Sequence, residues 1–440
     1  MQANSFPEAG RKAKIPAMLD LKYIKENAEA VKNNVADRFM SVDVDEVLRL
    51  YDRRNSLISS TDELRRRRNE NAASMERENP QMREKLIFEG RNLKESIAAA
   101  EAELTETKNA LLETTKRIPN MTHPAAPRGR EEKDNSVISR YGELPEFNFK
   151  PKDHLELAAG LNLVDFETAA KVSGSKFYYL KNQAVMLDLA LSRYALDILS
   201  KHNFTITITP DIAKEKIVEG AGFVPRGAEA NIYALEDTDA CLIGTAEITL
   251  GGFHADEIIN LDKGPILLAG LSHCFRKEAG AAGKYSKGLY RVHQFTKVEM
   301  FACARAENSE QVLIELRDIE EEIFRGLRIP YRIVDSCTGD LGMPAYRKFD
   351  LEAWMPGRGG NGAWGEVTSA SNCTDYQARR LGIRYRENGR TRYVHTLNGT
   401  AIAIPRTLVS LLENGQREDG SVTIPECLTP YCGFTEIKAL

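Results

Sequence analysis

The 440-residue chain carries 60 lysines and arginines against 64 aspartates and glutamates. Its formal net charge of −4 gives no global signature of nucleic-acid binding, so we expect no DNA partner, and any nucleic-acid contact must depend on a local basic patch. The seven cysteines include no Cys-x-x-Cys pair, so neither a disulfide framework nor zinc is expected. There is no apolar run of about 18 residues, so no membrane span is expected either.

Residues 1–17 form an irregular, basic extension that contains Arg11, Lys12 and Lys14. The extension lacks the apolar core of a secretory signal. An upstream start, residues introduced by cloning and the stub of an organellar presequence all fit it, and the residues alone leave these origins open. A second methionine, Met18, opens the segment 18–118, which we predict to be a separate helical domain.

Between about 44 and 118 the sequence predicts two long helices, because glycine and proline are almost absent. In the second helix, spacings of four and three alternate and predict a coiled-coil seam of Leu86, Gly90, Leu93, Ile97, Ala100, Leu104, Thr107 and Leu111. The first helix has a weaker heptad of Leu50, Leu57 and Leu64. Asn79-Pro80 separates the helices, which are expected to pair as an antiparallel hairpin, each about 50 Å long.

A run of four arginines, Arg65, Arg66, Arg67 and Arg68, lies toward the far half of this hairpin. Charge runs on coiled coils are usually solvated outer positions. The alternative is a patch that contacts phosphates, which would bind nucleic acid with salt-sensitive, sequence-poor affinity. The residues alone leave both interpretations open.

Residues 119–150 combine proline, glycine and polar side chains and are predicted to be a linker. From 151 to 440, strands and helices intermix. Extended runs with two-residue alternation at 204–209, 265–276, 290–303 and 349–355 predict an antiparallel sheet flanked by helices. We therefore predict an α+β chain in which a two-helix arm precedes one mixed domain.

Two charged strands joined by a glycine-containing loop are the most informative feature of the mixed domain. The strands are Cys274-Phe-Arg-Lys-Glu278 and Gly288-Leu-Tyr-Arg-Val-His-Gln-Phe-Thr-Lys-Val-Glu-Met-Phe301, and the loop contains Gly280 and Gly283. Because side chains alternate faces, one face would carry Arg291, His293, Phe295, Lys297 and Glu299, with Arg276 and Glu278 together on the partner strand. An ionic ladder on an exposed strand pair would give the same pattern.

Three further segments place polar side chains where a site could form. In Thr245-Ala246-Glu247, the hydroxyl and the carboxylate share a face if the segment is extended. Glu366-Val-Thr-Ser369 offers the hard oxygen ligands that Mg²⁺ prefers near phosphates. Pro405 predicts the start of a helix, which places Arg406 in the first turn. The helix dipole disfavours a cation at this position, and a residue that is locally unfavourable often belongs to a functional site.

In order and form, these segments resemble the motifs of the class II aminoacyl-tRNA synthetases, and the string from Gly288 to Glu299 resembles the seryl-tRNA synthetases in particular. The resemblance extends from Met18 to the C-terminus. It implies a class II catalytic domain over 151–440 and a homodimer built through the helix and strand at 186–210. It also implies that the domain at 18–118 binds tRNA by its shape, with the four arginines as contacts.

The same resemblance implies residue roles. Arg276 would hold the α-phosphate of ATP and Arg406 the γ-phosphate, and both are expected to be catalytic. The implied ATP-binding set is Arg276, Lys277, Glu278, Phe295, Glu366, Val367, Thr368, Ser369 and Arg406, with Mg²⁺ held through ATP by Glu366 and Ser369. The implied L-serine set is Thr245, Ala246, Glu247, Glu299 and Thr400. Thr368 and Thr400 stand where the family more often has serine, and each keeps the hydroxyl.

The implied reaction joins L-serine to ATP as seryl-adenylate, releases pyrophosphate, and transfers serine to the 3′ end of tRNA-Ser, and of tRNA-Sec where one exists. The first alternative is a synthetase-like ligase that charges a carrier protein, a type that lacks the long arm. The second is a non-catalytic coiled-coil protein, which the retained ATP ligands disfavour. A bacterial cytoplasmic location fits the Met18 start and is preferred, whereas a mitochondrial or plastid matrix fits the basic extension.

Overall fold

The computed structural model describes residues 19–75, 79–226, 230–278 and 287–438. They divide into two compact units: the first holds the described residues up to Pro119 except Asp37–Phe39, and the second holds those three residues together with the chain from Asn120 onward. Among the described residues, none of the helices combines the length and the apolar character needed to cross a membrane.

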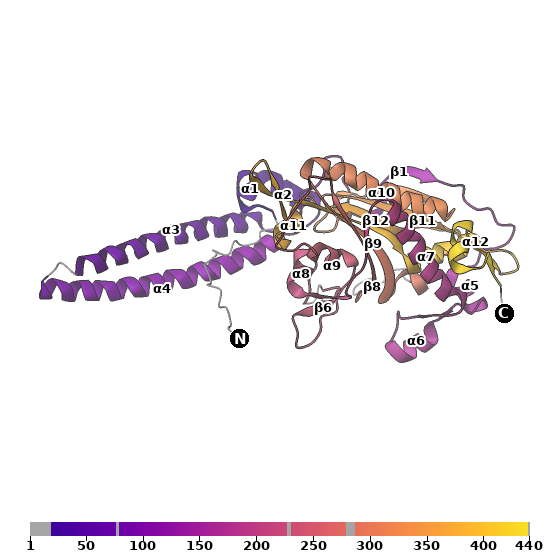
Figure 1. Ribbon diagram of the computed structural model, residues 1–440, viewed down its shortest axis with the longest axis horizontal. Helices are drawn as coiled ribbons and strands as arrows, with labels where there is room; N and C mark the ends of the chain where they lie inside the picture. The colour runs from indigo at the N-terminus through magenta and orange to yellow at the C-terminus, as the bar shows by residue number, and fades with distance from the viewer. Residues whose placement is uncertain (1–18, 76–78, 227–229, 279–286, 439–440) are drawn as a thin grey trace, which may run out of the picture. The chain divides into compact units, whose positions relative to one another are not determined.

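The first unit is helical, with α1 (Leu21–Glu26), α2 (Ala28–Asp37), α3 (Val44–Met75) and α4 (Pro80–Lys116). The predicted hairpin is confirmed: α3 and α4 lie side by side, and Asn79 caps α4 by accepting a hydrogen bond from the amide of Met82 at 3.0 Å (Figure 1). The predicted seam follows the less exposed face of α4: Leu93, Ile97, Thr107 and Leu111 are buried, and the other four predicted residues are partly buried.

The second unit is built on an eight-stranded sheet in the order β1-β10-β11-β12-β15-β9-β8-β4. Every neighbouring pair is antiparallel except β4 with β8. In chain order the strands are β1 (Ser136–Tyr141), β4 (Thr205–Ile208), β8 (Ile266–Phe275), β9 (Gln294–Ala304), β10 (Tyr331–Asp335), β11 (Arg347–Met355), β12 (Ala363–Asn372) and β15 (His395–Ala403). The edge strand β1 lies within the segment predicted to be a linker. All six of its residues are exposed, so the sequence shows no alternation of buried and exposed side chains from which the strand could be predicted.

Helices cover both faces of the sheet. The larger core packs α5 (His154–Gly160), α7 (Gln183–Lys201), α10 (Ser309–Gly326) and α12 (Ile404–Gly415) against side chains such as Val298 and Met300 of β9. The smaller core packs α9 (Ala246–Gly252) and α11 (Tyr376–Leu381) against Phe301 and Cys303 of the same strand. The predicted alternation along β9 therefore holds, and both of its faces are covered.

The remaining elements are short and lie outside the main sheet. The helices are α6 (Phe166–Ser173), α8 (Glu215–Gly220) and α13 (Thr429–Cys432). Two-stranded sheets pair β2 (Val164–Asp165) with β3 (Tyr179–Leu180), β5 (Ile212–Lys214) with β6 (Ala240–Leu242), and β16 (Val422–Thr423) with β17 (Glu436–Ile437). A three-stranded sheet contains β7 (Ile258–Ile259), β13 (Arg384–Glu387) and β14 (Arg390–Tyr393).

Two local predictions need correction. The strand predicted from residue 290 begins at Gln294, after a 3₁₀ turn over Gly288–Tyr290. The segment Thr245 to Glu247 is not extended: Thr245 is the N-cap of α9, and its hydroxyl accepts a hydrogen bond from the amide of Glu247 at 3.2 Å. A threonine two residues before an acidic side chain suits a helix start as well as a strand, so the triplet alone could not distinguish them.

Candidate functional site

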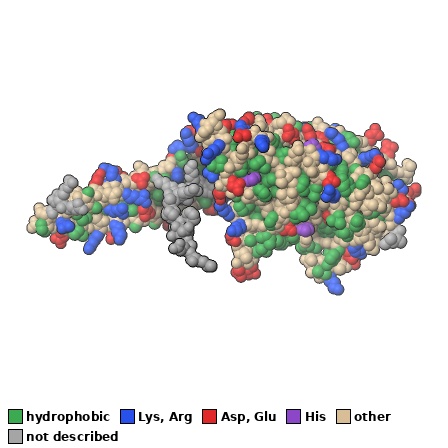
Figure 2. All heavy atoms as spheres, viewed as in Figure 1, with side chains coloured by type: hydrophobic (Ala, Val, Ile, Leu, Met, Phe, Trp, Pro, Cys, Tyr) green, Lys and Arg blue, Asp and Glu red, His purple; other side chains and the backbone are tan. Residues whose placement is uncertain are grey.

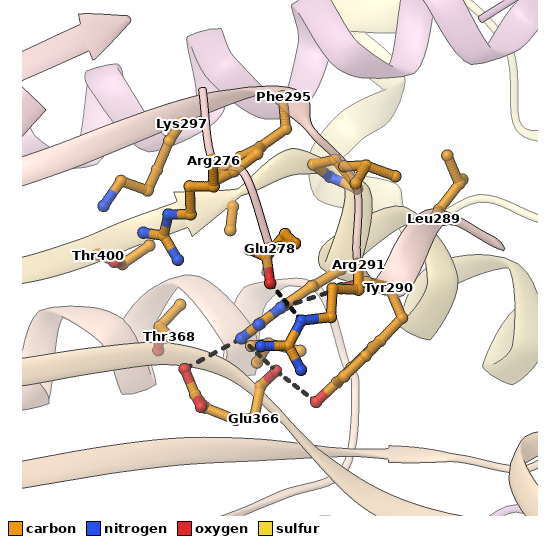
Figure 3. Close-up of a pocket in the computed structure, with 15 residues that line it drawn as sticks. Arg276, Glu278, Leu289, Tyr290, Arg291, Phe295, Lys297, Glu366, Thr368 and Thr400 are labelled. Carbon is orange, nitrogen blue, oxygen red and sulfur yellow. Dashed lines mark hydrogen bonds and ion pairs between the residues drawn. The ribbon is translucent and has the colours of Figure 1, made fainter. Parts of the chain in front are cut away.

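A pocket opens in the second unit where β9, β12 and β15 meet the start of α12 (Figure 3). Its lining is rich in charged and aromatic side chains and consists of Arg276, Glu278, Leu289, Tyr290, Arg291, Val292, Phe295, Lys297, Glu366, Val367, Thr368, Thr400, Ala403, Pro405 and Arg406. The fold therefore brings together the predicted strand pair, the segment that contains Glu366 and the first turn of α12, which contains Arg406.

Arg276 follows β8, and two contacts orient its side chain. Its Nε donates a hydrogen bond to the carbonyl of Gly244 at 3.0 Å, and its Cζ lies 5.3 Å from the ring centroid of Phe295. The pairing of Cys274 with Phe295 across β8 and β9 brings ring and guanidinium to the same end of the sheet. A cation beside a flat aromatic face offers a phosphate a counter-charge and a base a stacking surface.

Glu278 is 8% exposed and forms an ion pair with Arg291 on the pocket wall (Figure 3). Its backbone has a φ of 48°, and its amide donates a hydrogen bond to Oδ1 of Asn231 at 2.8 Å. This contact holds a left-handed conformation that most residues avoid. The predicted loop glycines Gly280 and Gly283 lie outside the described residues.

Arg406 lies in the first turn of α12, and Pro405 opens that helix, as the sequence predicts. The Arg406 Nη1 donates to Oε1 of Glu366 at 3.0 Å and to the Glu366 carbonyl at 3.1 Å. The hydroxyl of Tyr290 donates to the same carbonyl at 3.0 Å. Burial alone would raise the pKa of Glu366, but Arg406 and Lys348 outweigh it and hold that pKa below its ordinary value.

A bulge in β12 determines which side chains lie on the same face of the strand as Glu366. Glu366 pairs with Glu352 of β11, and Ser369 pairs with Asp350, so Glu366 and Ser369 share a face although they are three residues apart. Thr368 lines the pocket, but its hydroxyl donates to Oε2 of the buried Glu320 on α10 at 2.9 Å. Two hard oxygen donors are thus co-presented on one face.

Next to this pocket lies a buried polar cluster formed by α9, β9 and β15. Thr245, Lys297, Glu299 and Thr400 are each at most 9% exposed. The Lys297 Nζ donates to Oγ1 of Thr245 at 2.8 Å and forms an ion pair with Glu299. The hydroxyl of Thr400 donates to Oε2 of Glu299 at 3.2 Å. A cluster of this kind can recognise a small ligand that carries both an ammonium and a hydroxyl group.

Glu247 adds a second buried carboxyl group to this polar cluster. Its Oε1 accepts hydrogen bonds from Nε2 of Gln377 at 2.7 Å and from Nδ2 of Asn398 at 2.9 Å. Burial and the neighbouring Glu299 raise the pKa of Glu247 to about 7. The cluster therefore contains an acid that changes its charge near neutral pH, which is typical of functional sites.

Some predicted site residues contribute backbone or packing rather than a side chain on the pocket wall. Lys277 donates its amide to the carbonyl of Asn231 at 3.0 Å, and the fully buried Ala246 packs beside Leu250 in the smaller core. Tyr290 was not among the residues predicted for the site, although the motif that contains it was recognised.

Two other residues were missed at the polar cluster. Gln377 and Asn398 hold Glu247, and Asn398 begins the string Asn398-Gly-Thr400 beside a residue that was predicted. Among the described residues, no group of three or more His, Cys, Asp or Glu side chains is arranged to hold a metal ion by itself.

All four arginines of the arm are exposed. Three lie near acids: Arg65 bonds Glu101 at 2.7 Å, Arg66 bonds Glu70 at 2.7 Å, and Arg67 lies 3.6 Å from Glu89. Figure 2 shows blue and red side chains intermixed along the arm. Exposed ion pairs of this kind are weak, so phosphates can compete for these arginines.

Two family models match the chain. Residues 18–122 match the seryl-tRNA synthetase N-terminal domain, and residues 233–415 match the class II tRNA synthetase core domain of the G, H, P, S and T enzymes. The serine–tRNA ligase of Treponema denticola is 58% identical over 96% of this chain and 100% of its own length. That of Rubrobacter xylanophilus is 57% identical over 94% of this chain and 98% of its own.

Solved structures agree with these relatives. The seryl-tRNA synthetase of Pyrococcus horikoshii complexed with ATP aligns with a TM-score of 0.88 and 43% identity, over 96% of this chain and 100% of that one. The cytoplasmic serine–tRNA ligase of Naegleria fowleri in complex with AMP aligns with a TM-score of 0.82 and 30% identity, over 97% of this chain and 98% of that one.

Proposed function

Because this chain belongs to the seryl-tRNA synthetase family, we propose that the pocket and the buried polar cluster together activate L-serine with ATP, and that the helical arm binds the tRNA that receives the serine. The activity is that of an ATP-dependent, class II serine–tRNA ligase. The observation that carries the residue assignment is the junction of an arginine-lined pocket with a buried cluster of two carboxyl groups and two hydroxyls.

Arg276, Phe295 and Arg406 would bind ATP along the pocket. The Arg276 guanidinium neutralises the α-phosphate, Phe295 stacks on the adenine, and Arg406 receives the γ-phosphate. Glu278 accepts a hydrogen bond from the adenine amino group, and the backbone around Lys277 and Val367 completes the wall. A serine carboxylate oxygen then attacks the α-phosphorus, and the bond to the bridging oxygen breaks to release pyrophosphate.

The residues near the triphosphate fit Mg²⁺. Glu366 and Ser369 present hard oxygen donors on one face of β12, and the low pKa of Glu366 keeps its carboxylate charged. Mg²⁺ usually takes one or two protein groups and completes its shell with phosphate oxygens and water, so a fuller protein cage is not required. When bound, it would neutralise charge on the triphosphate.

L-Serine would occupy the polar cluster, with its ammonium group near Glu247 and Glu299 and its hydroxyl near Thr245 and Thr400. Ala246 would line the cavity through its backbone. Alanine would leave these buried groups without partners, and a site built for a hydroxyl can reject such an analogue by as much as ~10⁴. Threonine must be rejected by size.

The tRNA would bind the arm through Arg65, Arg66, Arg67 and Arg68, which contact phosphates and so read RNA shape. tRNA-Ser is the expected substrate, with tRNA-Sec as a further one. The carrier-protein alternative is disfavoured because the chain has the long α3 and α4 pair and matches the seryl-tRNA synthetase N-terminal domain. The bacterial relatives favour a cytoplasmic enzyme of bacterial type.

A homodimer would form through α7 and β4. Large apolar side chains are exposed there, including Val185 at 41%, Leu189 at 61% and Ile208 at 82%. The strand β4 lies at the edge of the sheet, so its outer backbone groups can pair or pack with a second copy. Exposed apolar patches of this kind are typical of protein interfaces.

The direct test is serine-dependent exchange of pyrophosphate into ATP. The wild-type chain should exchange with L-serine and not with L-alanine, and Arg406→Ala should reduce the exchange at least about a hundredfold, as expected when a charge that stabilises the transition state is removed. Charging of tRNA-Ser tests the second step. The absence of exchange in the wild-type chain would exclude the proposed activity.

A further inference from the structure

Arg358 lies in the loop between β11 and β12 and contacts Tyr290, which lines the ATP pocket. Its Cζ is 4.4 Å from the ring centroid of Tyr290. The Cζ of Arg406, from α12, is 4.9 Å from the same centroid. Two guanidinium groups from separate segments therefore lie over one aromatic ring, whose negative face attracts both cations.

The backbone of β12 is adapted to this arrangement at Gly365. A Cβ added there would lie 1.9 Å from Nη1 of Arg358 and 3.1 Å from both Sδ of Met355 and Oη of Tyr290. Glycine inside a strand is usually unfavourable and often marks the close approach of another group. The missing side chain at position 365 leaves the space that Arg358 fills, directly beside Glu366.

Tyr290 connects Arg358 to the groups that face ATP. Its hydroxyl donates to the carbonyl of Glu366 at 3.0 Å, and its own carbonyl accepts from Nε of Arg406 at 3.4 Å. Tyr290 ends a 3₁₀ turn, and its ring packs partly buried against the larger core. The contact with Arg358 therefore adds to a ring position that core packing and the hydrogen bond to Glu366 also hold.

We propose that Arg358 is a positioning residue for the triphosphate of ATP: by stacking on Tyr290 it holds Arg406 and Glu366 in the arrangement that receives the β- and γ-phosphates. The inference depends on the proposed function of the pocket, and it adds a residue from a loop outside the predicted motifs. Arg276 and Phe295 form the other end of the pocket, where they contact Gly244 and each other, so the adenine and α-phosphate end should be insensitive to removal of Arg358.

The test compares ATP with AMP in the full-length chain. Arg358→Ala should raise the KM for ATP in serine-dependent pyrophosphate exchange by about five- to tenfold, the range expected when a partly desolvated cation–π contact is removed. The Kd of AMP and the KM for serine should change less than about twofold. Arg386→Ala, which removes an exposed arginine of β13, is the matched control and should change none of the three.

Two further variants separate positioning from direct phosphate contact. Tyr290→Leu should reproduce the ATP defect, and adding Arg358→Ala to it should have little further effect, because the ring that transmits the contact is already gone. Gly365→Ala, which displaces the Arg358 side chain, should also raise the KM for ATP. Multiplicative effects in the double variant would overturn the positioning role and favour a direct phosphate contact.

Other outcomes are equally decisive. An equal loss of ATP and AMP binding, or an unchanged KM for ATP with normal wild-type exchange, would overturn the inference while leaving the proposed function intact. A wild-type chain without exchange would instead exclude the proposed function itself. If Arg358→Ala does not fold, Arg358→Gln, which keeps much of the side-chain length, carries the same comparison, with AMP binding as the measure of an intact pocket.

Discussion

At the scale of single residues, the proposed contact between Glu247 and the serine ammonium group would make serine binding depend on pH. Its pKa is raised to about 7 by burial and by Glu299, so the empty site holds it largely neutral below that pH. A serine ammonium group needs the ionised form. We expect the KM for serine to rise roughly tenfold between pH 8 and pH 6, because binding then requires loss of the proton.

The measurement is the KM for serine in pyrophosphate exchange across pH 6 to 8. Glu247→Gln should raise the KM at pH 8 and remove most of its pH dependence, whereas Glu236→Gln, at an exposed position, should leave the profile unchanged. A wild-type KM that stays flat over this range would contradict the assignment of Glu247 to the ammonium group.

Glu320 is a buried acid on α10, which packs against the eight-stranded sheet, and its ionisation should affect the stability of the fold. Burial raises its pKa well above the ordinary value of 4.5, and its Oε1 has no hydrogen-bond partner. A raised pKa in the folded state means that stability is fully present below pH 4.5 and is lost as pH rises toward the folded value. Acidic pH should therefore favour the neutral, folded form.

Glu320→Gln should remove this loss while keeping an oxygen that accepts from Thr368. We expect the variant to gain at least about 1 kcal/mol of unfolding free energy over wild type at pH 8, with a smaller gain near pH 5. Urea unfolding at both pH values measures it. Glu315→Gln, exposed on the same helix, is the control, and a pH-independent difference for Glu320→Gln would rule out a raised pKa.

At the scale of elements, substitution of two helical glycines by alanine should change stability in opposite directions. A Cβ at Gly90 on α4 would lie 3.4 Å from Oδ1 of Asn71 and 3.6 Å from Cε of Met75, which is ordinary contact. A Cβ at Gly326, the last residue of α10, would lie 1.9 Å from Oη of Tyr194. Only the first site has room for a side chain.

Gly90→Ala should stabilise the arm by about 0.5 to 1 kcal/mol through helix propensity. Gly326→Ala should destabilise the second unit by about 1 to 3 kcal/mol through overpacking. Hydrogen exchange in α4 measures the first change and denaturant unfolding the second. If Gly90→Ala does not slow hydrogen exchange in α4, the described geometry of the seam is wrong. If Gly326→Ala leaves the free energy of unfolding unchanged, Tyr194 can move away from the added methyl group.

Periodicity explains which elements could be predicted. The seam of α4 and the alternation of β9 are repeated over many residues, so their burial follows from the pattern. The bulge at Val367, which puts Ser369 on the face of Glu366, and the cap at Thr245 each depend on a single backbone conformation, and no period records them. Arg358 contacts Tyr290 from a loop, and the position of a loop residue follows from tertiary contacts alone.

At the scale of the whole molecule, the proposed function assigns one task to each of the two compact units. The proposed catalytic residues all belong to the second unit, and the four arginines belong to the first. Substitutions in the arm should therefore reduce tRNA charging without changing pyrophosphate exchange. This separation lets the tRNA-binding assignment be tested while serine activation reports on folding.

Arg68 is the most informative of the four arginines. Among the described residues it is exposed and has no acidic group within 4.0 Å, whereas Arg65 and Arg66 each have two and Arg67 has one. An arginine without such a neighbour does not have to break an ion pair before it contacts a phosphate. Arg68→Ala should thus weaken tRNA-Ser binding at least as much as Arg67→Ala, although both remove one positive charge.

Binding of tRNA-Ser as a function of salt concentration measures this effect. Removing one arginine–phosphate interaction should reduce the slope of log K against log salt by about 0.7 to 0.9, so the slope for Arg68→Ala should fall by nearly one unit. Arg68→Lys keeps the charge and should keep the slope. If Arg68→Ala weakens binding with no change in slope, the arginine acts through the structure of the arm; if neither changes, the phosphates lie on another face of the hairpin.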